Sequence, residues 1–112
     1  MISVLVERNK CGVLLGLKAS GHAKYAEKGF DIVCSAVSIL LKTTLMIVED
    51  LEGIELEADT ATRGQLGFKV CNSVLAPEME NELKFAGKFL EKGLGSISEE
   101  YPENLSVMYT TV

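Results

Sequence analysis

A cysteine and the chain's one histidine stand twelve residues apart, in a segment whose residue types could perform nucleophilic chemistry. Asp31 favours the N-cap of a helix, and the spacing from Asp31 then places Cys34 at N3, in the first helical turn. Unpaired N–H groups and the helix dipole favour the thiolate there, which is the reactive form of cysteine. His22 lies in a glycine-flanked segment that can fold back over this helix end, so the two residues could act as a nucleophile and its base.

A simpler interpretation of these residues stays open: Cys34 can be a small core residue, and His22 can belong to the surface of a loop. Ser38 follows Cys34 by one turn on the same helix face and could donate a hydrogen bond near the thiol. Serine within a helix often bonds back to its own backbone instead. Gly21, directly before the histidine, suggests a positive φ or the close approach of a substrate backbone.

The remaining cysteines, Cys11 and Cys71, have no neighbouring histidine, and we predict a structural role for both. The chain contains no C-x-x-C pair, and the cysteine separations do not resemble those of zinc ligands. The glycines match neither a dinucleotide fingerprint nor a phosphate-binding loop. We therefore expect no metal ion and no cofactor. Without a predicted signal peptide or membrane span, the expected location is the cytoplasm. Three cysteines cannot all pair within one chain, and we expect free thiols in those reducing surroundings.

Composition limits the class of protein further. The 112 residues suffice for one domain, residues 1–112, and the 47% hydrophobic content is that of a globular chain. A net charge of −5 argues against direct nucleic-acid binding through phosphate neutralisation. Polar side chains interrupt the longest apolar stretch, residues 32–48, which favours a core helix over a membrane span. The first residues have no basic region before an apolar segment, so they resemble a strand more than a signal peptide.

Alternation of apolar and polar residues predicts four strands in two hairpins: residues 2–7 with 13–18, and 54–59 with 66–71. Residues 19–30 show no period and contain two glycines. We expect a mobile loop there, which would carry the histidine and close over a bound peptide.

Apolar residues at three- and four-residue intervals predict a helix over residues 32–51, with Gly53 as its stop. The apolar face is broad, so we expect the helix to be covered on most sides. Pro77 suits the first turn of a second helix.

The second helix is predicted to place Phe85 and Phe89 beside its core face and to end at Gly93 and Gly95. Residues 107–109 can add a last strand. The predicted fold class is therefore α+β: a single domain of β-β-α-β-β-α order, with a long buried central helix against a small sheet and an optional C-terminal edge strand.

Two segments together carry a resemblance to a known family. Gly21-His22-Ala23, followed by residues 29–38 (GFDIVCSAVS), resembles the signature of the ribosomal-processing cysteine protease family, Prp. Members of that family are small one-domain cytoplasmic proteins of about this length, so the resemblance extends over essentially the whole chain.

The resemblance implies specific roles for the residues that match the signature. Cys34 would be the nucleophile and His22 the general base and later acid, as a Cys–His dyad, and Gly21, Asp31 and Ser38 would shape or support the site. The implied substrate is the precursor of a large-subunit ribosomal protein, which loses a short N-terminal extension after an aromatic residue in a hydrophobic motif. The resemblance also implies a homodimer.

Two other functions stay open at this point. The chain could be a non-catalytic, ribosome-associated assembly factor in which Cys34 is only packed. It could also be a thiol-based redox sensor that uses the same cysteine. Labelling of Cys34 by a peptide-like electrophile, and its dependence on His22, would separate these functions from proteolysis.

Overall fold

The computed structural model describes residues 1–21, 28–62 and 64–112, and of residues 28–31 it describes the backbone alone. Its elements confirm the predicted α+β class, the predicted order and the optional last strand. They are β1 (Ile2–Arg8), β2 (Leu14–Ser20), α1 (Lys28–Glu49), β3 (Leu56–Asp59), β4 (Gln65–Val70), α2 (Pro77–Glu100) and β5 (Leu105–Thr111).

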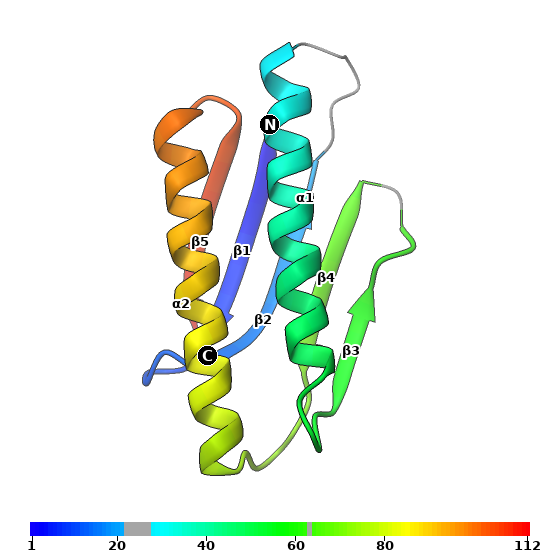
Figure 1. The fold of residues 1–112 in the computed structure, drawn as a ribbon, viewed down its shortest axis with the longest axis vertical. Helices are drawn as coiled ribbons and strands as arrows, with labels where there is room; N and C mark the ends of the chain where they lie inside the picture. The colour runs from blue at the N-terminus through cyan, green and yellow to red at the C-terminus, as the bar shows by residue number, and fades with distance from the viewer. Residues whose placement is uncertain (22–27, 63) are drawn as a thin grey trace.

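The strands form one mixed sheet in the order β3-β4-β2-β1-β5 (Figure 1). β1 and β2 make an antiparallel hairpin, and β4 is antiparallel to both β2 and β3. β5 returns at the far edge, parallel to β1, with Val107 opposite Val4. Ser20 pairs with Gln65, so the end of β2 lies next to the turn that joins β3 to β4. This register assembles one end of the sheet from segments that are distant in sequence.

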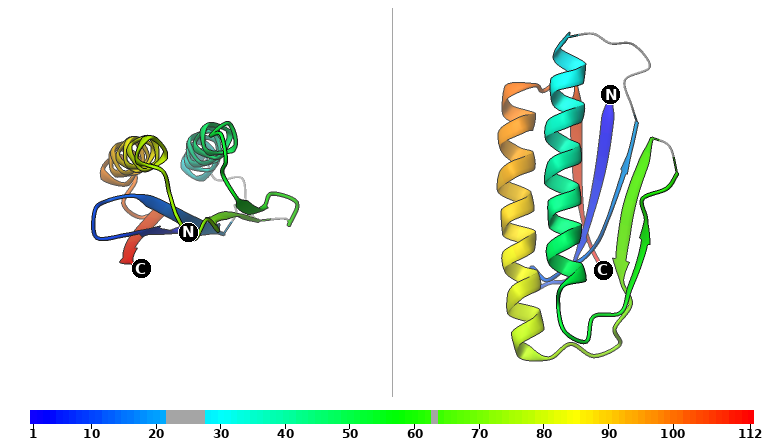
Figure 2. Two further views of the ribbon diagram at one scale, coloured as in Figure 1. Left: turned by 90° about the horizontal axis from the view of Figure 1, so that it is seen from below. Right: turned by 45° about the vertical axis from the view of Figure 1, so that its right-hand side comes forward.

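Both helices lie side by side on the same face of the sheet (Figure 2, left). The period of two along β1 turns Ile2, Val4 and Val6 toward the helices and leaves the alternate side chains on the opposite face. Each helix contributes one buried stripe to the layer between helices and sheet. The core of this layer includes Leu14, Leu17, Val33, Val37, Leu41, Val48, Phe68, Leu83, Leu90 and Leu94.

α1 is less covered than the sequence predicted. The sheet covers one side of the helix and α2 covers a second, whereas the outward side faces solvent (Figure 2, left). Ile39 and Met46 on that side are 67% and 62% exposed. The prediction of a helix buried on most sides is therefore wrong, since this fold has a single helical layer. By length and composition alone, residues 32–49 could cross a membrane. Of this segment, 33% is buried within the fold.

α2 continues through both glycines that were predicted to end it. It begins at Pro77, as expected, but runs past Gly93 and Gly95 to Glu100. A Cβ on Gly93 would lie 2.6 Å from Cδ2 of Leu40, so this glycine permits the close packing of α2 against α1. The local sequence suggested a helix end because it carries no information about this contact between two helices.

The two phenylalanines of α2 were predicted to pack beside the core face of the helix, and their packing is not found. Phe85 is 71% exposed and Phe89 is 43% exposed. The buried stripe of α2 consists of Met79, Leu83, Ala86, Leu90 and Leu94. Both phenylalanines lie to one side of that stripe, on the solvent side of the helical layer.

The predicted loop over residues 19–30 is shorter in the structure. β2 includes Ala19 and Ser20, and α1 begins at Lys28. Residues 22–27, which include His22, lie outside the described residues.

Candidate active site

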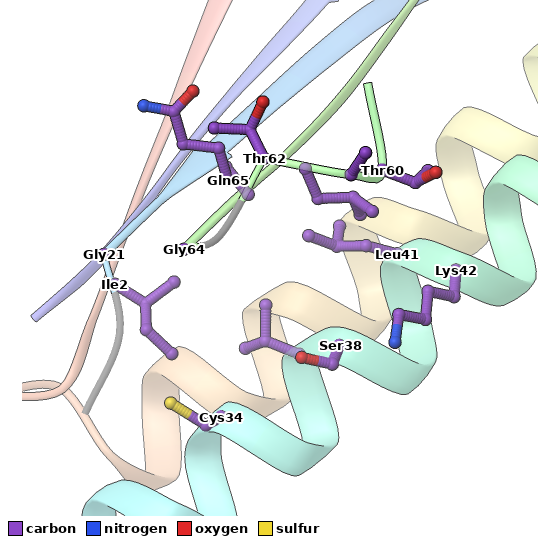
Figure 3. Close-up of a pocket in the computed structure, with 14 residues that line it drawn as sticks. Ile2, Gly21, Cys34, Ser38, Leu41, Lys42, Thr60, Thr62, Gly64 and Gln65 are labelled. Carbon is purple, nitrogen blue, oxygen red and sulfur yellow. The ribbon is translucent and has the colours of Figure 1, made fainter. Parts of the chain in front are cut away.

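A cavity of about 510 Å³ lies between α1 and the β3–β4 turn (Figure 3). α1 supplies one wall and residues 60–62 and 64–66 supply the other, while the start of β1 and the end of β2 contribute to the lining. The lining residues are Ile2, Ala19, Gly21, Cys34, Val37, Ser38, Leu41, Lys42, Thr60, Ala61, Thr62, Gly64, Gln65 and Leu66. Three predicted site residues, Gly21, Cys34 and Ser38, are therefore brought together at one cavity.

Cys34 is half-buried and lines this cavity, with its sulfur directed into the space beside α1 (Figure 3). Because α1 begins at Lys28, Cys34 is the seventh helical residue and not N3, so the predicted N-cap at Asp31 is wrong. A capping preference is worth only about 1 kcal/mol, which does not fix a helix start by itself. The dipole acts mainly within the first turn, so the argument from a helix start does not apply to Cys34 at this position.

Ser38 follows one turn after Cys34, and its side chain is exposed at the cavity wall (Figure 3). The sequence left open that this hydroxyl bonds back to its own helix. Among the described residues, that bond is made by Thr44, whose hydroxyl donates to the Leu40 carbonyl at 2.8 Å, and no such bond is found for Ser38. The Ser38 hydroxyl is therefore available to a group that enters the cavity.

Gly21 has the positive φ that the sequence suggested, at +100°. A Cβ on Gly21 would collide with the carbonyl oxygen of Met1 and would lie 3.3 Å from Cα of Ile2. The close approach that requires glycine thus comes from the chain's own first residues. Gly21 holds the end of β2 against the start of β1, at one end of the cavity.

Asp31 and His22, the other two predicted site residues, have no described side chain. Asp31 lies in α1, in the turn before Cys34, and its backbone alone is described. His22 lies outside the described residues, directly after Gly21, which itself lines the cavity. That the imidazole lies close to the Cys34 sulfur therefore stays a prediction.

The β3–β4 turn is ordered by one carboxylate. Asp59 accepts the backbone N–H groups of Ala61 at 3.2 Å and Thr62 at 3.1 Å, and the Thr62 carbonyl accepts the N–H of Gln65 at 3.1 Å. The Thr62 N–H, together with a side-chain hydrogen bond from the same residue, holds the pKa of Asp59 below its usual value. This network fixes the shape of the wall that faces α1.

Sequence reasoning predicted the hairpin of residues 54–59 with 66–71 but assigned no site residue to its turn, because only the sheet register brings this turn to the cysteine. It also missed Lys42, which lines the cavity one turn beyond Ser38. A signal for Lys42 was present: Cys34, Ser38 and Lys42 follow one another at four-residue spacing and share one side of α1 (Figure 3).

The other two cysteines lie away from the cavity. Cys11, in the β1–β2 turn, and Cys71, directly after β4, are both exposed, so neither fills the core as a structural residue would. Within residues 1–21, 28–62 and 64–112, no group of three His, Cys, Asp or Glu residues could hold a metal ion.

The geometry fits the class of cysteine hydrolases, in which a thiol opens into a groove that can admit an extended acyl substrate. The family model described as "Cysteine protease Prp" matches residues 1–106, and the chain belongs to this family of ribosomal-processing cysteine proteases.

Individual relatives match this chain over nearly its whole length. The ribosomal processing cysteine protease Prp of Bacillus subtilis (strain 168) is 27% identical over 107 residues, which are 96% of each chain. The Prp protease of S. aureus, solved in complex with a substrate peptide, has a TM-score of 0.78 at 23% identity and covers 98% of this chain and 100% of its own. SMU.848 from Streptococcus mutans has a TM-score of 0.75 at 27% identity, over 100% of this chain and 96% of its own.

Proposed function

We propose that this chain is a cysteine endopeptidase that removes the short N-terminal extension of a large-subunit ribosomal protein. The observation that carries the proposal is the position of Cys34, whose sulfur opens into a cavity of about 510 Å³ between a helix and a turn. Membership of the Prp family supports the same activity. A ribosomal precursor as substrate would place the enzyme in the cytoplasm.

The proposed chemistry uses Cys34 and His22 as a dyad. His22 accepts the thiol proton, and the sulfur attacks the scissile carbonyl to form a tetrahedral intermediate. Collapse of this intermediate breaks the C–N bond, and His22 returns the proton to the leaving amine. Water, deprotonated by the same imidazole, then hydrolyses the thioester and releases the new carboxylate together with the free thiol.

The cavity supports a peptide substrate by its lining. Val37, Leu41 and Leu66 give it an apolar surface suited to the side chains of a hydrophobic motif. Ser38 and Thr62 place hydroxyl groups at the walls, where they can bond to a peptide backbone. Since Cys34 is the seventh residue of α1, its own N–H is paired within the helix, so donors to the oxyanion have to come from other segments.

Co-expression with the candidate ribosomal precursor tests this function. The Cys34→Ala variant should leave the precursor uncleaved while it retains the fold, and Cys71→Ala, which changes an exposed thiol outside the cavity, should process normally. Processing by folded Cys34→Ala would contradict the proposal. Labelling of Cys34 by a peptide-like electrophile should also depend on His22, and independence from His22 would contradict the dyad.

We further propose that the active form is a homodimer, joined through the solvent side of the helical layer. Large apolar side chains of both helices are exposed there, most strongly Ile39, Met46 and Phe85. Exposed apolar patches of this kind mark interaction surfaces, and a twofold dimer would bury the same patch from both copies.

A further inference from the structure

The cavity that contains Cys34 extends along α1 well beyond the thiol. Cys34 lies near Gly21 and Ile2, whereas Lys42 lies further along α1, with its amine directed back toward Ser38, and Thr60 lies on the opposite wall (Figure 3). The eight residues from Cys34 to Lys42 correspond to about 12 Å along the helix axis. An extended peptide advances roughly 3.3 Å per residue, so this distance spans about three to four residues of substrate.

The charge along this path is concentrated in one side chain. Of the lining residues that the structure describes, Lys42 alone is charged, and the others are apolar, hydroxyl-bearing, amide or glycine. Carboxylates are numerous in this chain, which has a net charge of −5, yet none lines the described cavity. Lys42 also has no ion-pair partner among the described residues, where the one ion pair joins Arg8 to Glu91.

We infer that Lys42 is a specificity-determining residue, which selects substrates that carry a carboxylate three or four residues from the scissile bond. The inference rests on the proposed function and specifies the substrate further. An ammonium group on a flexible stem acts as a point charge, and it can reach a carboxylate without demanding one fixed geometry. Since Lys42 is exposed, the expected preference for a charged over a neutral peptide is about three- to fivefold.

The test uses fluorescent ten-residue peptides, each with one Phe-Ala bond and with either Asp or Asn at the third or fourth residue on either side of it. Binding is measured by anisotropy to the Cys34→Ala background, and cleavage is measured with the intact chain. One Asp peptide should bind about three- to fivefold more tightly than its Asn counterpart, and this ratio should fall as salt is raised. Lys42→Met should remove the preference, and Lys42→Glu should reverse it.

Lys92→Met serves as the matched control, because Lys92 is an exposed helical lysine of α2 outside the cavity, and it should keep the full preference. Equal binding of the Asp and Asn peptides at all positions, or an unchanged preference in Lys42→Met, would overturn the inference. A charge preference in binding without any cleavage by the intact chain would support the role of Lys42 and contradict the protease. Cleavage of every peptide at one rate would support the protease and contradict the role of Lys42.

Discussion

Gly93 of α2 lies against the side chain of Leu40 of α1, so closely that a Cβ on the glycine would fall 2.6 Å from Cδ2 and 2.8 Å from Cδ1 of the leucine. This contact sets how near the two helices approach. Because α1 carries Cys34 and forms one wall of the cavity, the packing of α2 also determines where that wall lies.

Gly93→Ala and Gly95→Ala should therefore change the free energy of unfolding by different amounts or in opposite directions. A Cβ on Gly95 would meet no atom within 4 Å, so alanine there should stabilise the helix by up to about 1 kcal/mol. At position 93 the same gain is opposed by an overpacking cost of about 1–3 kcal/mol. Urea unfolding of both variants measures the difference, and an equal gain at both positions would show that Leu40 moves aside without cost.

Gly93 also illustrates what the sequence could and could not predict. Alternation and helical periods predicted the order of the elements and the core stripes, because these patterns are local. The continuation of α2 through its glycines and the exposure of Phe85 depend on how many layers surround a helix, which no local pattern contains. The site shows the same limit. Sequence spacing predicted that Cys34 and Ser38 are neighbours, whereas the β3–β4 turn comes close to them only through the register of the sheet.

Gly21→Ala should reduce stability as well as activity. Alanine at this position would require a positive φ and would collide with the Met1 carbonyl, and strain of this kind costs about 1–3 kcal/mol. The displaced end of β2 would also disturb the cavity, which Gly21 lines. Melting temperature and peptide turnover should fall together. Lost turnover at an unchanged melting temperature would assign Gly21 to substrate contact instead.

The Asp59 turn should make stability depend on acid pH. The Thr62 N–H lowers the pKa of Asp59 in the folded state, so its stabilisation is present above the unfolded pKa of about 3.9 and is lost as pH falls through the folded value. Asp59→Asn removes the charge and keeps an acceptor oxygen. The variant should therefore be less stable than the parent near neutral pH, and the difference should vanish in acid.

Glu57→Gln is the control for Asp59, since Glu57 lies in the same strand and its carboxylate accepts no hydrogen bond from the described residues. Unfolding free energies from about pH 2 to 7 provide the measurement. A difference between Asp59→Asn and the parent that does not change with pH would contradict a charge-dependent role.

The proposed dimer predicts that charge on the helical layer separates the two copies. Phe85→Glu should shift the protein toward monomer in light scattering at a given concentration, because it would place a carboxylate in an apolar interface. Met108→Glu is the matched control: Met108 is 65% exposed, but it lies on β5 and faces the side of the sheet opposite the helices. A parent protein that is monomeric at all concentrations, or a dimer that only Met108→Glu dissociates, would contradict this interface.

Ser38 allows a test that separates site chemistry from folding. Its hydroxyl makes no hydrogen bond among the described residues, so Ser38→Ala removes no structural contact and replaces serine by a better helix former. Stability should therefore be unchanged or slightly raised, by up to about 0.5 kcal/mol. Peptide turnover should nevertheless fall, since the hydroxyl lines the cavity one turn from the Cys34 sulfur. Loss of a single neutral hydrogen bond to substrate would reduce turnover about three- to tenfold.

Ser35→Ala is the control for Ser38→Ala. It changes an exposed serine of the same helix that does not line the cavity, and it should leave turnover unaffected. Equal turnover in both variants would show that Ser38 does not contact the substrate.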